Sequence, residues 1–247
     1  MTISKVAPGV WRAGTRYVNW YIVDGGQEGV TLIDAGLPTY ERELDQSLHQ
    51  AGRSKADLRS VVLTHGHIDH IGMACTLAKL GATIYLHQAD WYLAAHPRSN
   101  KPERSVIRYA YYPGMIGFLA HAASQGGLRP SRMPQSIAIA DGSTLDAPGR
   151  PLVTHTPGHT DGSCVLEFRE HGVVFVGDLL CTISAFTGRC ADPQLQVRGS
   201  NSSSGQAMTS LRRLENVQAR VVLPGHGNPW TDGVEAAVAS AMRIGCK

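Results

Sequence analysis

Three histidines and an aspartate lie close together in the segment 65–70, directly after a short apolar run. His65 and His67 are two positions apart, so their side chains can point the same way, while Asp69 and His70 can reach a second point nearby. Imidazole nitrogens and carboxylate oxygens are metal ligands, and one loop of this kind could hold two metal ions. The alternative is a histidine-rich turn with only local hydrogen bonds.

The segment resembles the His-x-His-x-Asp-His signature of the metallo-β-lactamase-fold hydrolases. Further positions support the resemblance, because they occur in the family's order along most of the chain. Chance is a poor explanation for so many matches in order. The matching positions outside the histidine-rich segment are Asp34, His159, Asp178 and His226.

The resemblance implies a dinuclear metal centre and a role for each matching residue. Imidazole and carboxylate ligands suit two Zn²⁺, and Fe or Mn is also compatible, because sequence gives ligand type and not metal identity. No cysteine lies in these motifs, which disfavours a closed structural zinc site. Asp34, at the end of an apolar run, would orient the metal loop. The implied ligands are His65, His67 and His159 for one ion, Asp69, His70 and His226 for the other, and Asp178 as a bridge.

The chemistry implied by such a centre is hydrolysis. A bridging hydroxide would attack an electrophilic carbonyl, because metal ions lower the pKa of bound water toward about 7. Asp69 would orient this water and carry its proton, which makes it the candidate catalytic residue. The implied ligands leave coordination positions open, which disfavours a non-enzymatic scaffold.

Within the family, the carboxylate of Asp178 separates this chain from the lactamases, which carry cysteine or serine at that place. The bridging aspartate is similar to that of lactonases and glyoxalase II. The favoured function is therefore a metal-dependent hydrolase that cleaves an ester, lactone or thioester. The alternatives are a mononuclear iron enzyme similar to persulfide dioxygenases, and β-lactamase or phosphodiesterase activity.

The fold class implied by the resemblance is α/β (α+β): a four-layer αβ/βα sandwich of two mixed β-sheets with outer helices, the metallo-β-lactamase fold. Apolar runs and helical periodicity alternate along both halves of the chain in an order that fits it. The segment 179–204 is rich in glycine, serine and threonine and is expected to be loop. Strands are expected at 9–13, 18–23, 30–35, 61–63, 82–86, 137–140, 152–156, 164–168, 173–176 and 221–223, and helices at 38–51, 71–80, 207–217 and 234–244.

Length and composition indicate one globular domain over residues 1–247. Of the 247 residues, 43% are hydrophobic and 17% are charged, which is ordinary for a globular protein. The motifs are spread from end to end, which favours a single unit over two domains. The net charge of +3 is small and the chain has no long basic run, so nucleic acid is not an expected partner.

The sequence also indicates a compartment. The chain shows no apolar run of the roughly 20 residues that a membrane helix needs, and no signal-peptide pattern at its start. Its five cysteines are scattered and form no Cys-x-x-Cys pair, as is typical of free thiols in a reducing compartment. We expect a cytoplasmic enzyme that acts on a small-molecule substrate and has no membrane partner.

A partly helical insertion is expected at about 88–135, where six aromatic residues are interleaved with basic ones. Aromatic side chains offer large contact areas, so we expect this insertion to form a lid or pocket wall beside the metals. The substrate would then carry an apolar group next to its carbonyl. The alternative is a satellite hydrophobic cluster or the interface of a homodimer. The predicted pocket residues are Tyr17, Tyr111 and Tyr112, with Arg104 or Arg108 available to a carboxylate or phosphate.

Overall fold

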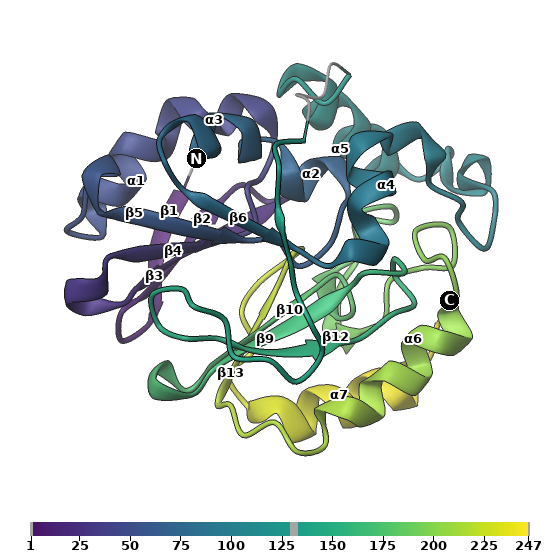
Figure 1. The fold of residues 1–247 in the computed structure, drawn as a ribbon. Coiled ribbons are helices and arrows are strands. Elements are labelled where there is room, and N and C mark those ends of the chain that lie inside the picture. Colours follow the sequence, from purple (N-terminus) through teal and green to yellow (C-terminus); the bar gives the residue numbers. More distant parts are fainter. Residues whose placement is uncertain (1, 129–132, 247) are drawn as a thin grey trace.

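The computed structural model describes residues 2–128 and 133–246. Two mixed β-sheets pack face to face, and helices cover the outer face of each sheet (Figure 1). The layers are therefore helices, a larger sheet, a smaller sheet and helices, as the sequence predicts. No helix within the described ranges combines the length and the apolar character that crossing a membrane requires.

The larger sheet has seven strands within the described ranges, and they follow one another across the sheet in sequence order. They are β1 (Thr2–Ala7), β2 (Val10–Gly14), β3 (Asn19–Asp24), β4 (Val30–Ile33), β5 (Leu58–Val62), β6 (Thr83–Leu86) and β7 (Ile137–Ala138). Neighbours from β1 to β4 are antiparallel and form a meander. Neighbours from β4 to β7 are parallel, so the chain needs a crossover between each pair. The sequence did not predict β1, whose residues are exposed or half-buried and form no apolar run.

The smaller sheet and a separate strand pair come from the second half of the chain. Their strands are β8 (Leu152–His155), β9 (Cys164–Phe168), β10 (Val173–Gly177), β11 (Cys181–Ile183), β12 (Cys190–Gln194) and β13 (Val221–Pro224). The smaller sheet has the order β13-β10-β9-β8, in which only β10 and β13 are parallel neighbours among the described strands. The β11–β12 pair corrects the expectation of loop at 179–204. β11 has only three residues, and β12 does not alternate apolar and polar residues, so the pattern gave no signal for either strand.

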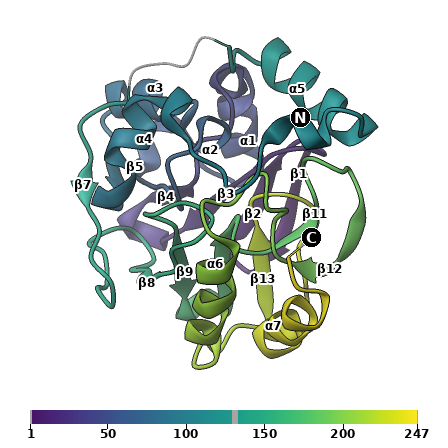
Figure 2. The same cartoon turned by 90° about the vertical axis from the view of Figure 1, so that its right-hand side faces the viewer.

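Helices form the two outer layers (Figures 1 and 2). They are α1 (Leu44–Gln50), α2 (Ile68–Ile71), α3 (Ala74–Lys79), α4 (Trp91–Ala95), α5 (Pro113–Ser124), α6 (Ser204–Leu211) and α7 (Gly233–Ile244). Helices α1 and α3 cover the larger sheet, and α6 and α7 cover the smaller one. The helix expected at 38–51 is a 3-10 helix, Pro38–Glu43, followed by α1.

Side chains of the strands fill three hydrophobic cores, one between each pair of layers. On β3, Trp20 and Ile22 pack beneath the outer helices, while Tyr21 and Val23 pack between the two sheets. On β10, Val174 packs toward α6 and α7. Because both faces of such strands are buried, they read in the sequence as continuous apolar runs.

The insertion between β6 and β7 is partly helical, as expected, and contains α4 and α5. Its residues 129–132 lie outside the described ranges. His121 of α5 contacts the hydroxyl groups of Tyr40 at 2.7 Å and Thr15 at 3.3 Å. The ring of Phe118, also on α5, lies against Tyr17, with 6.4 Å between ring centroids. These contacts hold α5 against the loop that follows β2.

Candidate metal centre

The predicted ligands follow the carboxyl ends of strands that point toward one edge of the sandwich. In the larger sheet, the parallel strands β4 and β5 lead to Asp34 and to the loop that carries His65. In the smaller sheet, β8, β10 and β13 run in one direction and lead to His159, Asp178 and His226. Because the carboxyl ends of strands that run the same way share an edge, these side chains meet there.

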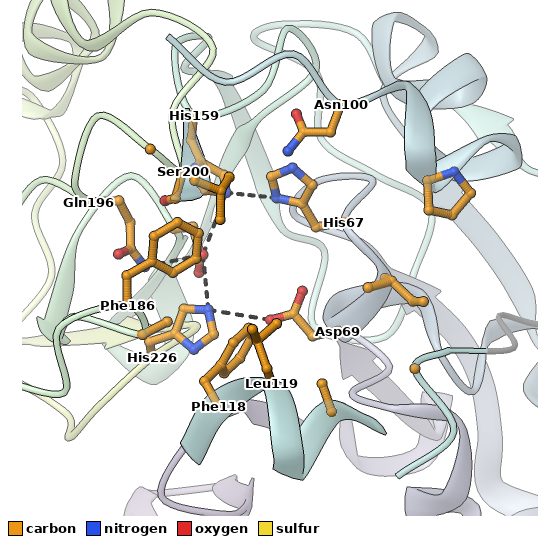
Figure 3. Close-up of a pocket in the computed structure, with 18 of the residues that line it drawn as sticks. His67, Asp69, Asn100, Phe118, Leu119, His159, Phe186, Gln196, Ser200 and His226 are labelled. Atoms are coloured by element: carbon orange, nitrogen blue, oxygen red, sulfur yellow. Dashed lines mark hydrogen bonds and ion pairs between the residues drawn. The ribbon is translucent and has the colours of Figure 1, made fainter. Parts of the chain in front are cut away.

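All the predicted metal ligands lie in one cluster of side chains that are mostly buried. The ligand atoms of each grouping lie within 4.8 Å of one another, close enough to bind a common ion. Figure 3 shows His67, His159, Asp69 and His226 turned toward one space. The groupings are His65, His67 and His159, called the first group below; Asp69, His70 and His226, called the second group; and His65, His70 and Asp178.

Asp178 lies between the two groups. Its Oδ2 is 3.5 Å from Nε2 of His159 in the first group and 3.0 Å from Nε2 of His226 in the second. Its Oδ1 is 3.5 Å from Nε2 of His70. A bridging carboxylate needs this position, and the two groups divide the ligands as the family resemblance implies. The assignment of an ion to each group stays a prediction.

Hydrogen bonds at the outer ring nitrogens orient four of the histidines. In each, Nδ1–H donates to a protein oxygen, which turns Nε2 toward the centre, where it can bind a metal ion once it carries no proton. The acceptors are Oγ1 of Thr64 for His65 (3.0 Å), Oδ2 of Asp34 for His70 (2.8 Å), Oδ1 of Asn201 for His159 (3.0 Å) and the carbonyl oxygen of Tyr17 for His226.

Unpaired polar atoms in this cluster fit a bound cation. Nε2 of His65, Nε2 of His70 and Oδ1 of Asp178 are buried without a hydrogen-bond partner among the described residues. Such atoms are costly to bury unless something binds them. Nδ1 of His67 faces Nε2 of His159 at 2.9 Å. Two nitrogens on one tetrahedral Zn²⁺, with bonds of 2.0–2.1 Å, would lie roughly 3.3 Å apart. The donor set therefore fits divalent metal ions.

Two ligands of the first group, His65 and His159, are held in the neutral form. Burial lowers the pKa of His65 well below its usual 6.5, and the nearby His70 and His159 lower it further. Burial also lowers the pKa of His159 to about 3, against the opposing effect of Asp178. Neutral imidazole is the form that binds a metal ion, so these two ligands need no deprotonation.

The second group lies in an excess of negative charge. Burial lowers the pKa of His70, but three nearby carboxylates outweigh it and raise this pKa to about 10. These carboxylates belong to Asp34, Asp69 and Asp178. Burial raises the pKa of Asp178, yet His226 and His70 hold it well below its usual value. The charge that favours a proton on His70 would equally favour a divalent cation in its place.

Asp34 organises the loop that follows β5. Its carboxylate accepts hydrogen bonds from the backbone N–H of Thr64 at 2.8 Å, from the Thr64 hydroxyl at 2.9 Å and from His70 at 2.8 Å. Its backbone φ is 60°, a left-handed conformation that aspartate tolerates better than most residues. The structure thus gives Asp34 contacts suited to orienting the metal loop, the role implied by the resemblance.

Two supporting residues had no sequence signal. Asn201 fixes His159 through Oδ1, and its amide nitrogen donates to the carbonyl oxygen of Gln196 at 3.0 Å. The side chain of Gln196 donates from Nε2 to Oδ2 of Asp178 at 3.2 Å. Both lie in the segment 179–204, where the sequence predicted only loop. Only their tertiary contacts reveal these roles.

A cavity of about 280 Å³ opens in front of the ligands. His67, Asp69, His159, Asp178 and His226 lie at its metal-facing end. The remaining described residues that line it are uncharged. The insertion supplies much of the wall, as predicted, and Figure 3 shows Phe118 and Leu119 of α5 near Phe186 from the segment after β11.

The sequence also suggested five residues that would contact the substrate. None of the five that the sequence suggested is among the described residues that line this cavity. Tyr111 is 73% exposed and stacks on Tyr112, with 4.4 Å between ring centroids. Arg104 and Arg108 are exposed. Tyr17 lies behind the cavity wall, where its carbonyl oxygen accepts from His226 and its ring contacts Phe118. The aromatic composition of this region suggested contact with a ligand, but Tyr17, Tyr111 and Tyr112 pack against other aromatic rings.

A family model described as the Metallo-beta-lactamase superfamily matches residues 13–226. The chain belongs to the metallo-beta-lactamase superfamily. Among relatives in this superfamily, the probable metallo-hydrolase YqjP of Bacillus subtilis is 28% identical over 224 residues, covering 85% of this chain and 67% of that protein. The acyl-coenzyme A thioesterase MBLAC2 of Gallus gallus is 30% identical over 236 residues, covering 88% of this chain and 75% of that protein.

Two solved structures share the fold. The family protein TTHA1429 from Thermus thermophilus has a TM-score of 0.70 at 25% identity, covering 97% of this chain and 80% of that one. TTHA1623 in a di-iron-bound form has a TM-score of 0.60 at 28% identity, covering 92% of this chain and 96% of that one. This superfamily member is therefore a homologue of metallo-hydrolases with groups of histidine and aspartate that can bind metal.

Proposed function

We propose that the protein is a metal-dependent hydrolase with a dinuclear centre, which cleaves a carboxylic ester, lactone or thioester. We further propose that the group bound beside the scissile carbonyl is uncharged and apolar. One observation carries both proposals: unpaired ligand atoms converge at the end of a cavity whose other described lining residues are uncharged.

The chain's own residues supply binding, orientation and proton transfer. The first group would hold one ion and the second group the other, with Asp178 between them. When bound, the ions provide an activated water as nucleophile and a Lewis acid for the carbonyl oxygen. Asp69 lines the cavity, and its Oδ2 lies 3.4 Å from Nε2 of His226. This carboxylate can therefore orient the attacking water and accept its proton.

The cavity wall supports an uncharged acyl or lactone group. Leu119 and Phe118 offer apolar contact, and no described lysine or arginine lines the cavity. The carboxylate of a β-lactam would bring a further negative charge into the apolar part of this space without a cationic side chain to pair with it. The thioesterase activity named for MBLAC2 supports a thioester as one form of the substrate.

A substrate panel tests the proposal. The purified chain is stripped of metal, reloaded with Zn²⁺ and assayed on acyl thioesters and esters from two to ten carbons and on γ-lactones with alkyl substituents. A β-lactam and a phosphodiester serve as comparison. We expect metal-dependent hydrolysis of the carboxylic substrates that increases with acyl length. Turnover of only the phosphodiester or only the β-lactam would overturn the proposal. So would full activity in a protein that holds one iron ion and consumes O₂ during turnover.

A further inference from the structure

We propose that Asp90 is a positioning residue for the first metal group, which it holds in place by joining two ligand-bearing loops. This inference rests on the proposed metal centre, and it concerns metal binding and not the choice of substrate. Asp90 lies shortly after β6, at the start of the insertion, and is only 1% exposed. It belongs to neither ligand group.

The Asp90 carboxylate accepts three hydrogen bonds from two separate loops. Oδ2 accepts from the backbone N–H of Gly66 at 2.8 Å and from the hydroxyl of Thr160 at 2.6 Å. Oδ1 accepts from the backbone N–H of Gly162 at 2.7 Å. Hydrogen bonds to an ionised carboxylate are stronger than those between neutral groups, so Asp90 holds the two loops together strongly.

The three donors lie in the two segments that carry the ligands of the first group. Gly66 lies between His65 and His67 in the sequence, and Thr160 directly follows His159. Asp90 thus holds the backbone between His65 and His67 and the side chain of the residue that follows His159. Its carboxylate hydrogen bonds among the described residues reach neither the loop that carries His226 nor the one that carries Asp178.

Close packing of two glycines shows that the loops are shaped around Asp90. A Cβ atom on Gly162 would lie 2.6 Å from Cγ of Asp90, and one on Gly66 would lie 3.0 Å from the Asp90 carbonyl oxygen. Cβ atoms essentially never approach as closely as the first distance, and the second, to the Asp90 backbone, is tighter than most Cβ contacts. The glycines therefore allow both loop backbones to approach one side chain.

Asp34 provides a counterpart at the second group. Its carboxylate accepts directly from His70, a ligand of that group, whereas Asp90 acts on the backbone of the first. Each ligand group is thus supported by hydrogen bonds to a buried carboxylate that belongs to neither group. Loss of such supporting contacts typically costs about 10–100-fold in metal affinity.

Replacement of Asp90 by asparagine tests the inference with little change in volume. Asparagine keeps one acceptor oxygen but turns an NH₂ group toward a donor, so at least one of the three hydrogen bonds is lost. Asp161→Asn is the matched control, because Asp161 is exposed and lies in the same loop between Thr160 and Gly162. Thr160→Val is a milder second variant that removes one donor and leaves the carboxylate.

The measurement is Co²⁺ titration of the metal-free full chain, followed by visible absorption. His159→Ala and His226→Ala provide the reference spectra for a chain that has lost one or the other group. Urea unfolding of each metal-free variant shows whether the fold is retained. Because the readout is metal binding, failure of the ester assay would leave this inference standing.

We expect Asp90→Asn to weaken binding at the first group about 10–100-fold, with Thr160→Val weakened less. The remaining absorption should match that of His159→Ala, and Asp161→Asn should bind as the wild type does. If Asp90→Asn binds both ions with wild-type affinity, the inference is wrong. It is also wrong if both ions weaken equally in step with a fall in unfolding free energy, since Asp90 would then be a general structural residue.

Discussion

Nδ1 of His70 donates a hydrogen bond to Oδ2 of Asp34 at 2.8 Å, across two loops that follow neighbouring parallel strands. This contact fixes the tautomer of His70 and directs its Nε2 at the second group. Asp34 also accepts two hydrogen bonds from Thr64, so one carboxylate sets the position of both the loop and the ligand.

Asp34→Asn is therefore expected to reduce kcat/KM and metal affinity about 10–100-fold while the chain stays folded. Asparagine tolerates the left-handed backbone at this position, but its NH₂ group would face either His70 or Thr64. Steady-state kinetics and elemental analysis of the same preparation check the result. Wild-type values for both would show that the Asp34–His70 contact does not orient the ligand.

Asp178→Asn is expected to abolish turnover and retain the fold. The amide has nearly the same volume, but it loses the negative charge that would lie between two cations. Gln196→Leu is the graded comparison, since it removes only the hydrogen bond to Oδ2 and should leave measurable activity. Turnover and metal content near those of the wild type in Asp178→Asn would show that this carboxylate does not bridge.

Metal removal is expected to lower the free energy of unfolding. Metal ions that bind only the native state add about 4 kcal/mol each when the free metal is about 1,000 times its Kd. Urea unfolding with added Zn²⁺ and with excess chelator measures the difference in unfolding free energy between the loaded and the metal-free protein. This difference should be smaller for His226→Ala. Identical unfolding curves would mean that the unpaired atoms of the cluster do not bind metal.

Truncation of Leu119 tests the cavity wall. Leu119 lines the cavity and is 53% exposed, while Ile116 on the same helix is 59% exposed and does not line it. Leu119→Ala should raise KM for a decanoyl thioester roughly fivefold, equivalent to about 1 kcal/mol of lost apolar contact, and leave an acetyl thioester unaffected. Ile116→Ala is the matched control. Equal effects of both variants on both substrates would show that α5 does not contact the substrate.

The fold and the ligand cluster could be predicted because both depend on short-range signals. Strands buried on two faces give continuous apolar runs, and the ligands follow directly at their carboxyl ends. His65, His67 and His70 come from one loop, so their spacing alone indicated metal binding. His159 and His226 completed the ligand pattern, because they follow along the chain in the order that the superfamily shows.

The supporting residues could not be predicted, because their function arises from contacts between distant segments. Asn201 reaches His159 across 42 positions, and Asp90 reaches Gly162 across 72. Neither lies in a motif. The lining of the cavity could not be predicted for another reason: the composition of the insertion indicated that aromatic residues cluster, but not that Tyr111 turns outward while Leu119 lines the cavity.

Metal content measured together with turnover tests the dinuclear hydrolase most directly. The chain is reloaded with Zn²⁺ after chelation, dialysed, and analysed for bound metal while the same sample hydrolyses an acyl thioester. We expect about two ions per chain at full turnover, and about one ion with little turnover when His159 or His226 is replaced by alanine. Full turnover in a chain that holds a single ion, or none, would contradict the dinuclear centre.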